Sequence, residues 1–246
     1  MFSFFSNKSK PAVNLSAIHT DMHSHLLPGI DDGSPDAETS LELMKGLEDL
    51  GLKKFITTPH ILWDLYRNDN ETIGAAQAVL EDEAEIRNIP ITISAAAEYM
   101  MDDHFAGLLR NKHPLRSFAG NHVLVEFSFV SQPFEWKEML FDLQIQGYQP
   151  VLAHPERYSY LGTHVAPFQE IADMGVLLQV NLNSLTGYYG KPAFALAQGL
   201  IKNKLVSLVG TDLHHTRHLD ALRQSTQLMP LLNTLLESGR ILNPTL

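Results

Sequence analysis

Residues 18–33 read IHTDMHSHLLPGIDDG, and they place His23 and His25 two positions apart at the end of a short apolar run. Side chains two apart on a β-strand point to the same face of the sheet. Two imidazoles held in this way can bind one metal ion. The stretch therefore predicts a β-strand that presents metal ligands at its carboxyl end.

Five further apolar runs downstream end in the same way, with a histidine or a carboxylate. These runs read KKFITTPH, ITISAAAE, HVLVE, QPVLAH and VSLVGTDLH, and they end in His60, Glu98, Glu126, His154 and the pair Asp212 and His214. One such ending would carry little weight. Five after the first predict a ring of ligands gathered at one end of a sheet.

The apolar runs alternate with amphipathic segments of helical spacing. Strands are predicted at 18–23, 53–58, 91–98, 122–128, 149–153, 176–181 and 205–210. Helices are predicted at 34–51, 71–88, 134–146, 165–174, 191–203 and 218–237, the first with Ser34 as its N-cap and Pro35 at its first position. Continuous apolar strands are typical of a parallel sheet that is buried on both faces.

Seven strands with crossover helices are one short of the eight in a standard (β/α) barrel, so either one strand is hidden or the barrel has seven. Catalytic groups of such barrels project from the carboxyl ends of the strands, where every candidate ligand falls. No low-complexity linker interrupts the chain. We therefore expect a single α/β domain over residues 1–246, with residues 1–16 as a loosely ordered N-terminal segment.

Composition excludes several classes of function. The chain of 246 residues is 44% hydrophobic and can bury a large core, yet no run approaches 18 apolar residues, so no membrane span is expected. The absence of cysteine excludes thiolate metal sites and a cysteine nucleophile. A net charge of −10 argues against a nucleic-acid partner. The N-terminus has a short apolar tip before its lysines, the reverse of a secretory signal, which predicts a cytoplasmic protein.

The phrases DMHSHLLPGIDDGS, ITTPH, AEYM, VEFS, LAHPERY and GTDLHH, in this order, resemble the polymerase and histidinol phosphatase (PHP) superfamily. The closest resemblance is to its bacterial tyrosine-phosphatase branch, which is tied to capsular and exopolysaccharide synthesis. It implies a distorted (β/α)7 TIM-like barrel and a cluster of up to three divalent metal ions. Mn²⁺ is the first choice, and Fe or Zn²⁺ also suit mixed imidazole and carboxylate ligands.

Carried over to this chain, the resemblance implies three adjoining metal sites. The ligand sets are His23, His25, Glu98 and Asp212 for the first ion, Glu98, Glu126 and His154 for the second, and Asp32, His60 and His214 for the third. Asp32, the second acid of the DDG motif, is preferred to Asp31. Any single histidine at a strand end is more often a hydrogen-bonded structural residue, so the prediction rests on the whole set.

Other residues are assigned less directly. Arg157 in HPER matches the family's phosphate-contacting arginine, although it could instead pair with its neighbour Glu156; Arg217 is a looser match. Trp63 and Tyr66 are predicted to form an aromatic rim for the substrate, with loop packing as the alternative. Asn181 and Asn183 could orient ligands, bind substrate or cap a turn, and the role of His215 stays open; His19, His104, His113, His122, His164 and His218 are predicted to be surface or packing residues.

The resemblance implies a metal-dependent protein-tyrosine phosphatase that is not cysteine-based. A metal-bound hydroxide would hydrolyse phosphotyrosine directly, and the implied substrate is the tyrosine-rich tail of a bacterial tyrosine autokinase that controls polysaccharide export. One alternative is a small-molecule phosphoesterase of the same superfamily, similar to histidinol phosphatase. Another is a non-catalytic regulator that binds metal or a kinase.

Overall fold

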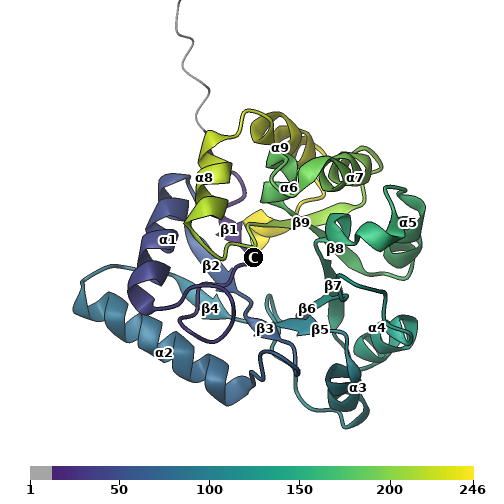
Figure 1. Ribbon diagram of the computed structural model, residues 1–246, viewed down its shortest axis with the longest axis horizontal. Helices are drawn as coiled ribbons and strands as arrows, with labels where there is room; N and C mark the ends of the chain where they lie inside the picture. Colours follow the sequence, from purple (N-terminus) through teal and green to yellow (C-terminus); the bar gives the residue numbers. More distant parts are fainter. Residues whose placement is uncertain (1–12) are drawn as a thin grey trace, which may run out of the picture.

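A computed structural model describes residues 13–246, in which parallel strands surround a centre and helices lie outside them (Figure 1). The strands are β1 (Thr20–Asp21), β2 (Lys54–Thr57), β3 (His60–Ile61), β4 (Ile93–Ala95), β5 (Glu98–Met100), β6 (His122–Glu126), β7 (Gln149–Ala153), β8 (Leu177–Asn181) and β9 (Val206–Gly210). The α-helices are α1 (Ala37–Asp49), α2 (Asn70–Ile86), α3 (Asp103–Arg110), α4 (Trp136–Ile145), α5 (Ala166–Asp173), α6 (Leu182–Thr186), α7 (Gly190–Lys202), α8 (Thr216–Gln224) and α9 (Leu228–Glu237). Short 3₁₀ turns are η1 (Pro155–Arg157), η2 (Ser159–Leu161) and η3 (Asn243–Thr245).

The strands form two parallel sheets. One has the order β1-β2-β4 and the other the order β3-β5-β6-β7-β8-β9. Two of the predicted strands contribute to both sheets, because each is interrupted: β2 and β3 are separated by Thr58 and Pro59, and β4 and β5 by Ala96 and Ala97. Pro59 has no N–H to donate to a ladder, which accounts for the first interruption. The α/β fold with parallel strands is as predicted, whereas the two strands near 53–58 and 91–98 are divided.

The first and last strands, β1 and β9, meet without a regular ladder in the described part of the chain. A single parallel bridge joins Ser24 to Leu213. Two backbone hydrogen bonds accompany it, from Asp212 N to His23 O at 2.8 Å and from His25 N to Leu213 O at 3.0 Å. Both bonds belong to segments that carry predicted metal ligands. The seam between β1 and β9 therefore holds His23 and His25, early in the chain, next to Asp212, near its end.

Buried side chains complete this seam. The Asn243 amide donates to Thr20 O at 3.0 Å and to Val209 O at 2.7 Å. The Asp21 carboxylate accepts from Thr211 N at 2.9 Å and from Thr211 Oγ1 at 2.6 Å. Burial raises the pKa of Asp21 to about 6 although the Thr211 hydrogen bonds act in the opposite direction. Side chains thus replace the ladder that the two edge strands do not form.

We expect Asp21→Ala to lower the free energy of unfolding by about 2–6 kcal/mol, because two buried donors of Thr211 lose their acceptor at roughly 1–3 kcal/mol each. Urea unfolding followed by circular dichroism measures the change. Asp49→Ala is the control, since Asp49 is half-exposed on α1 and pairs only with surface side chains. Equal unfolding midpoints for the two variants would show that the seam does not depend on Asp21.

The first predicted helix differs at its start. It begins at Ala37, and Asp36 rather than Ser34 is the N-cap, with its side chain accepting from Thr39 N at 2.8 Å. Ser34 lies two residues earlier, where its N–H donates to His25 O at 3.0 Å. The Ser34 backbone is therefore committed to the loop that returns to a predicted metal ligand, and the N-cap moves two residues on.

Other helices also differ from the predicted pattern. The segment predicted as one helix at 218–237 is two helices, α8 and α9, because Ser225 after α8 is extended. The short helices α3 and α6 were not predicted, since a helix of one or two turns leaves little periodicity in a sequence. No helix within residues 13–246 is both long and apolar enough to cross a bilayer.

Two groups of buried apolar side chains stabilise the fold. The larger packs the helices against the outer face of the strands. The smaller lies among the strands and consists of Met22, Ile56, Ala96, Phe118, Leu124, Val151, Ala153 and Leu208. Residues 13–16 differ from the predicted loose segment, because Leu15 is fully buried and its N–H donates to Leu50 O at 2.6 Å. The rest of that prediction, residues 1–12, lies outside the described residues.

Candidate metal centre

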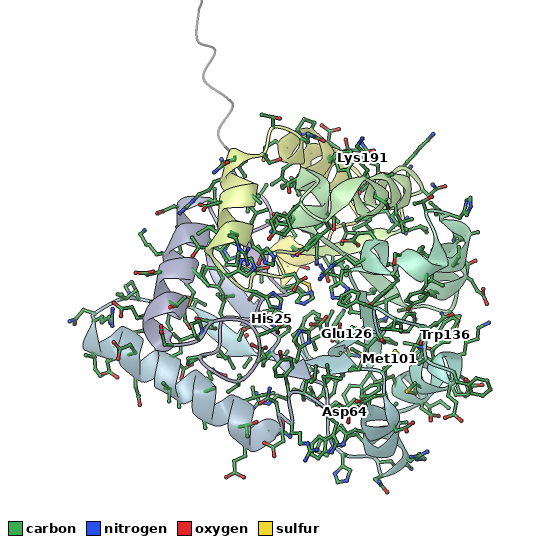
Figure 2. All side chains as sticks on the ribbon, in the orientation of Figure 1. His25, Asp64, Met101, Glu126, Trp136 and Lys191 are labelled. Atoms are coloured by element: carbon green, nitrogen blue, oxygen red, sulfur yellow. The ribbon has the colours of Figure 1, made fainter. Side chains whose placement is uncertain are left out.

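A cavity of about 210 Å³ opens where the strands end. It is lined by Asp32, His60, Glu126, Phe129, His154, Arg157, Asp212, His214, His215 and His218. The other predicted ligands, His23, His25 and Glu98, are fully buried beside it. Figure 2 shows His25 and Glu126 near the middle of the ring of strands, whereas Asp64 and Trp136 lie at the periphery. The structure therefore brings all nine predicted ligands to one place.

The residues predicted for the first ion form a tight group. The Nε2 atoms of His23 and His25 lie 3.4 Å apart. Glu98 Oε2 lies 3.2 Å from His23 Nε2 and 3.4 Å from His25 Nε2. Asp212 Oδ1 approaches the same two nitrogens, at 3.5 and 3.4 Å. Four ligand atoms from the first, third and last predicted strands thus face one point.

The residues predicted for the second ion adjoin this group through Glu98. Its other oxygen, Oε1, lies 3.0 Å from His154 Nε2. Glu126 Oε2 is 3.9 Å from the same nitrogen, and Glu126 Oε1 is 3.0 Å from His60 Nδ1. Glu98 therefore presents one oxygen to each group, as a carboxylate that bridges two ions does.

The residues predicted for the third ion gather on the opposite side of His60. Asp32 Oδ1 lies 3.6 Å from His60 Nε2 and 3.6 Å from His214 Nε2. His25 has a ligand atom close to the same group. Asp31 has a different role, because its Oδ2 accepts from His25 Nδ1 at 2.8 Å. Asp32 is thus the acid of the DDG motif that faces the cavity.

The donor set fits divalent cations. Ligands that coordinate a first-row metal at about 2.0–2.2 Å lie roughly 3.0–3.6 Å from one another, which is the spacing found here. Three buried atoms of the set, His60 Nδ1, Glu98 Oε1 and Glu126 Oε1, lie close to other members but form no well-aligned hydrogen bond among the described residues. A buried polar atom without a partner is costly. Cations between these atoms would satisfy them, although the assignment of each ligand to one ion stays a prediction.

Electrostatics support the same conclusion. Burial disfavours a charged imidazole, but the carboxylates of Glu126 and Glu98 outweigh it and raise the pKa of His60 to about 9. Burial likewise opposes the ionised form of Glu98 and Asp212, yet the surrounding imidazoles, His23 foremost, hold both pKa values well below the ordinary range. The carboxylates therefore require positive charge, which either protons or metal ions can supply.

Hydrogen bonds to the outer ring nitrogens fix the direction of the imidazoles. Gln179 Oε1 lies 2.8 Å from His23 Nδ1, and Asp212 O lies 3.0 Å from His214 Nδ1. With Asp31 on His25, these contacts leave Nε2 of each ring free to face the cluster. Gly210 is required nearby, because a Cβ at that position would lie 2.5 Å from His23 Cβ.

We expect Asp31→Ala to weaken metal binding by about 10–100-fold, the usual effect of removing a residue that orients a histidine ligand. Asp31 Oδ2 also accepts from His60 N at 3.1 Å, so two ligand-bearing segments lose a contact. Calorimetric titration of the stripped protein with Mn²⁺ measures the affinity. The control is Asp64→Ala, an exposed acid away from the cavity. Unchanged affinity in Asp31→Ala would remove this residue from the support of the site.

Arg157 reaches the cluster. Its Nη1 donates to Asp212 Oδ2 at 2.8 Å, and the guanidinium carbon lies 4.6 Å from the Phe129 ring centroid and 4.3 Å from that of Tyr189. The alternative partner, Glu156, is buried and turned elsewhere: its Oε1 accepts from Asn181 N at 2.9 Å and from Ser184 Oγ at 2.6 Å. The guanidinium therefore lines the cavity, and it does not form an exposed ion pair with Glu156.

The remaining predicted residues lie around this centre at different depths. Arg217 is exposed in the first turn of α8 and is not among the cavity-lining residues. Tyr66 stacks on His60 with ring centroids 5.8 Å apart. Trp63 instead stacks on His104 at 3.9 Å and borders a different cavity. Asn181 holds the predicted ligand Asp212, since its amide donates to Asp212 Oδ2 at 2.6 Å.

Two lining residues were not among the preferred site residues predicted from the sequence. Phe129 packs on the His154 ring with centroids 5.5 Å apart, and it follows Glu126 by only three positions, a signal that could have identified it. His218 was predicted to be a surface or packing residue, but it lines the cavity and its Nδ1 lies 3.1 Å from Asp212 O. His218 follows the predicted ligand His214 by four residues, in the first turn of α8, and this spacing was the signal that could have identified it. His215 also lines the cavity.

Comparisons with known proteins agree with this geometry. The tyrosine-protein phosphatase YwqE of Bacillus subtilis is 28% identical over 197 residues, which cover 80% of this chain and 78% of YwqE. The tyrosine-protein phosphatase CpsB of Streptococcus pneumoniae is 25% identical over 205 residues, 79% of this chain and 82% of CpsB. A solved structure from work on YwqE and CpsB, described as unique metal-dependent tyrosine phosphatases, superimposes with a TM-score of 0.76 at 26% identity and covers 92% of this chain and 90% of that one.

The family model for capsular polysaccharide synthesis, CpsB/CapC, matches residues 19–227. This range begins just before β1 and extends past α8, so it contains every predicted metal ligand. The resemblance to the tyrosine-phosphatase branch is thereby confirmed at the level of the family. The chain belongs to the CpsB/CapC family of capsular polysaccharide synthesis.

Proposed function

We propose that this protein is a metal-dependent protein-tyrosine phosphatase that is not cysteine-based. The observation that carries the proposal is the set of nine histidine and carboxylate ligands around one cavity, with the Arg157 guanidinium at its edge. Its relatives YwqE and CpsB are tyrosine-protein phosphatases. The absence of cysteine from the whole chain closes the thiol mechanism.

We also infer that the two sheets together form the distorted seven-stranded barrel of the PHP fold. Each interrupted strand links one sheet to the other, and the β1–β9 seam joins their remaining edges. This arrangement places the carboxyl ends of all strands around one centre, which a barrel requires of its active site.

The predicted ligand sets would hold up to three divalent ions, with Mn²⁺ as first choice and Fe or Zn²⁺ as alternatives. When bound, such ions lower the pKa of a coordinated water and neutralise charge on the phosphoryl oxygens. The protein's own groups do the rest. Arg157 can bind two phosphoryl oxygens in parallel, and Phe129 beside it offers a ring face to an aromatic leaving group. A phenolate leaves readily because its pKa is only about 10, so a strong general acid is not essential.

The substrate that we propose is phosphotyrosine in a protein, in particular the tail of a bacterial tyrosine autokinase that controls capsule or exopolysaccharide synthesis. The proposed location is the cytoplasm, where such a tail would be found. Membership of the family of capsular polysaccharide synthesis supports this context.

Turnover of three substrates tests the proposal: a phosphotyrosine peptide, a phosphoserine peptide and histidinol phosphate, each with added Mn²⁺, Fe²⁺ or Zn²⁺. We expect the highest kcat/KM on the phosphotyrosine peptide. Iodoacetamide should leave this activity unchanged, because the chain has no thiol to alkylate. Preference for histidinol phosphate would instead indicate a small-molecule phosphoesterase, and the lack of any turnover would indicate a non-catalytic role.

A further inference from the structure

A second cavity, of about 430 Å³, adjoins the metal centre. We call it the side cavity; it lies between the η1–η2 turns after β7 and the start of α7. It shares two lining residues with the metal-centre cavity, Phe129 and Arg157. The two spaces are therefore neighbours on either side of one pair of side chains.

The side chains of Phe129 and Arg157, which separate the two cavities, are held in place by several contacts. The Arg157 guanidinium is placed between the rings of Phe129 and Tyr189, at 4.6 and 4.3 Å from their centroids. Its Nη1 is bonded to Asp212, so the side chain is anchored at the metal centre as well. Cation–π contacts of this length are favourable and restrain a flexible arginine. A phosphate bound at Arg157 would consequently lie on the boundary between the two cavities.

The chemistry of the side cavity differs from that of the metal centre. Apart from Phe129 and Arg157, its apolar lining comes from Tyr189, Pro192 and Ala193, and the exposed residues Ser159, Gly162 and Thr163 also line it. Glu156 is also present and buried: its Oε1 accepts from Asn181 N and Ser184 Oγ, whereas its Oε2 has no hydrogen-bond partner among the described residues, and a carboxylate here would repel a second phosphate. Such a lining suits a bulky apolar side chain rather than a second phosphate.

The volumes of the two cavities also favour a site for a substrate side chain in the side cavity. The metal-centre cavity is half as large as the side cavity and must accommodate ions and a phosphoryl group. A protein substrate must therefore extend beyond it. The side cavity begins at the residue that would contact the phosphate, within reach of the next side chains of an extended peptide.

We propose that the side cavity binds a bulky apolar or aromatic side chain of a residue that flanks the phosphotyrosine in the substrate, so that it selects the sequence to be dephosphorylated. This inference rests on the proposed function, since it assigns a further part of the same substrate. Burial of one such side chain contributes both affinity and specificity.

The experiment compares peptides with a small substrate. In a host phosphotyrosine peptide with alanine elsewhere, phenylalanine is placed in turn at each of the three positions on either side. We expect one position to raise kcat/KM by about tenfold or more in the wild-type enzyme, because a hydrophobic pocket discriminates by roughly 10–200-fold. Thr163→Trp, which fills the side cavity from its exposed rim, should abolish this preference. Hydrolysis of p-nitrophenyl phosphate should stay within about twofold, since that substrate has no flanking residue to lose.

Two further variants make the result specific. Ala193→Phe fills the side cavity from α7 and should behave as Thr163→Trp does. Ala195→Trp, exposed on the same helix and outside the lining, should keep the wild-type preference. A wild-type enzyme that hydrolyses all the peptides equally would overturn the side-cavity proposal alone. If p-nitrophenyl phosphate is hydrolysed but no phosphotyrosine peptide is, the proposed function fails and the side-cavity assignment fails with it.

Discussion

Chelation of the purified protein should abolish its phosphatase activity, and addition of Mn²⁺ or a related ion should restore it. The reason lies in the donor set: buried imidazoles and carboxylates converge on one cavity, and three of their atoms form no well-aligned hydrogen bond within the described chain. Chelation should also lower the melting temperature, because an ion that binds only the folded state stabilises it and the buried carboxylates repel one another without it. Full activity in protein shown to be metal-free would contradict the proposed metal-dependent mechanism.

Single substitutions extend this test. Glu98→Ala, His23→Ala or His154→Ala should each lower kcat by about a hundredfold or more, because metal ions contribute several kcal/mol of charge stabilisation in such sites. His113→Ala and His164→Ala are the matched controls, since both residues are exposed and neither lines the metal-centre cavity. Kinetics and metal content must be measured on the same samples. Similar losses in both groups would contradict the ligand assignment.

Replacement of Arg157 should produce the second large effect. Arg157→Lys keeps the charge but loses the planar fork that binds two phosphate oxygens in parallel. We expect kcat/KM to fall by about tenfold or more, roughly 1.4 kcal/mol of transition-state stabilisation. Arg157→Ala should be worse, because it also removes the guanidinium partner of the buried Asp212 carboxylate and the cation–π contacts with Phe129 and Tyr189.

Elemental analysis and circular dichroism must accompany these kinetics. Asp212 belongs to the predicted ligand set, so loss of Arg157 could act through the metal as well as through the phosphate. Arg217→Ala serves as the comparison, because this arginine is exposed on α8 and stays a weaker candidate. Wild-type kinetics in both Arg157 variants would remove this residue from the site.

Much of the site could be predicted because its chemistry is local. Every predicted ligand except Asp32 ends or closely follows an apolar run, and parallel strands bring their carboxyl ends together whatever the details of the loops. The choice of Asp32 over Asp31 agrees with the geometry, since Asp32 faces two imidazoles while Asp31 orients His25. The resemblance to a known family supplied the grouping of the ligands, which spacing alone does not give.

What sequence reasoning missed depends on tertiary contacts. The division of two strands follows from pairing with different neighbours, which no local pattern records. The side chain of Trp63 turns away to stack on His104, whereas Phe129 turns toward His154, and both lie a few residues after a ligand. Ser34 is a suitable N-cap by residue type, but its backbone N–H donates to His25 O, so the helix begins after Asp36 instead. These outcomes are decided by packing against distant segments.

The seam between β1 and β9 has a consequence for how the enzyme is made. His23 and His25 are among the first described residues to leave the ribosome, whereas Asp212 and His214 follow the final strand. At about 5–20 residues per second, the early ligands wait many seconds for their partners. The ligand sets predicted for the first and third ions are therefore incomplete during most of synthesis. An incomplete chain that ends before β9 keeps the HxH motif yet lacks two of the predicted ligands, Asp212 and His214.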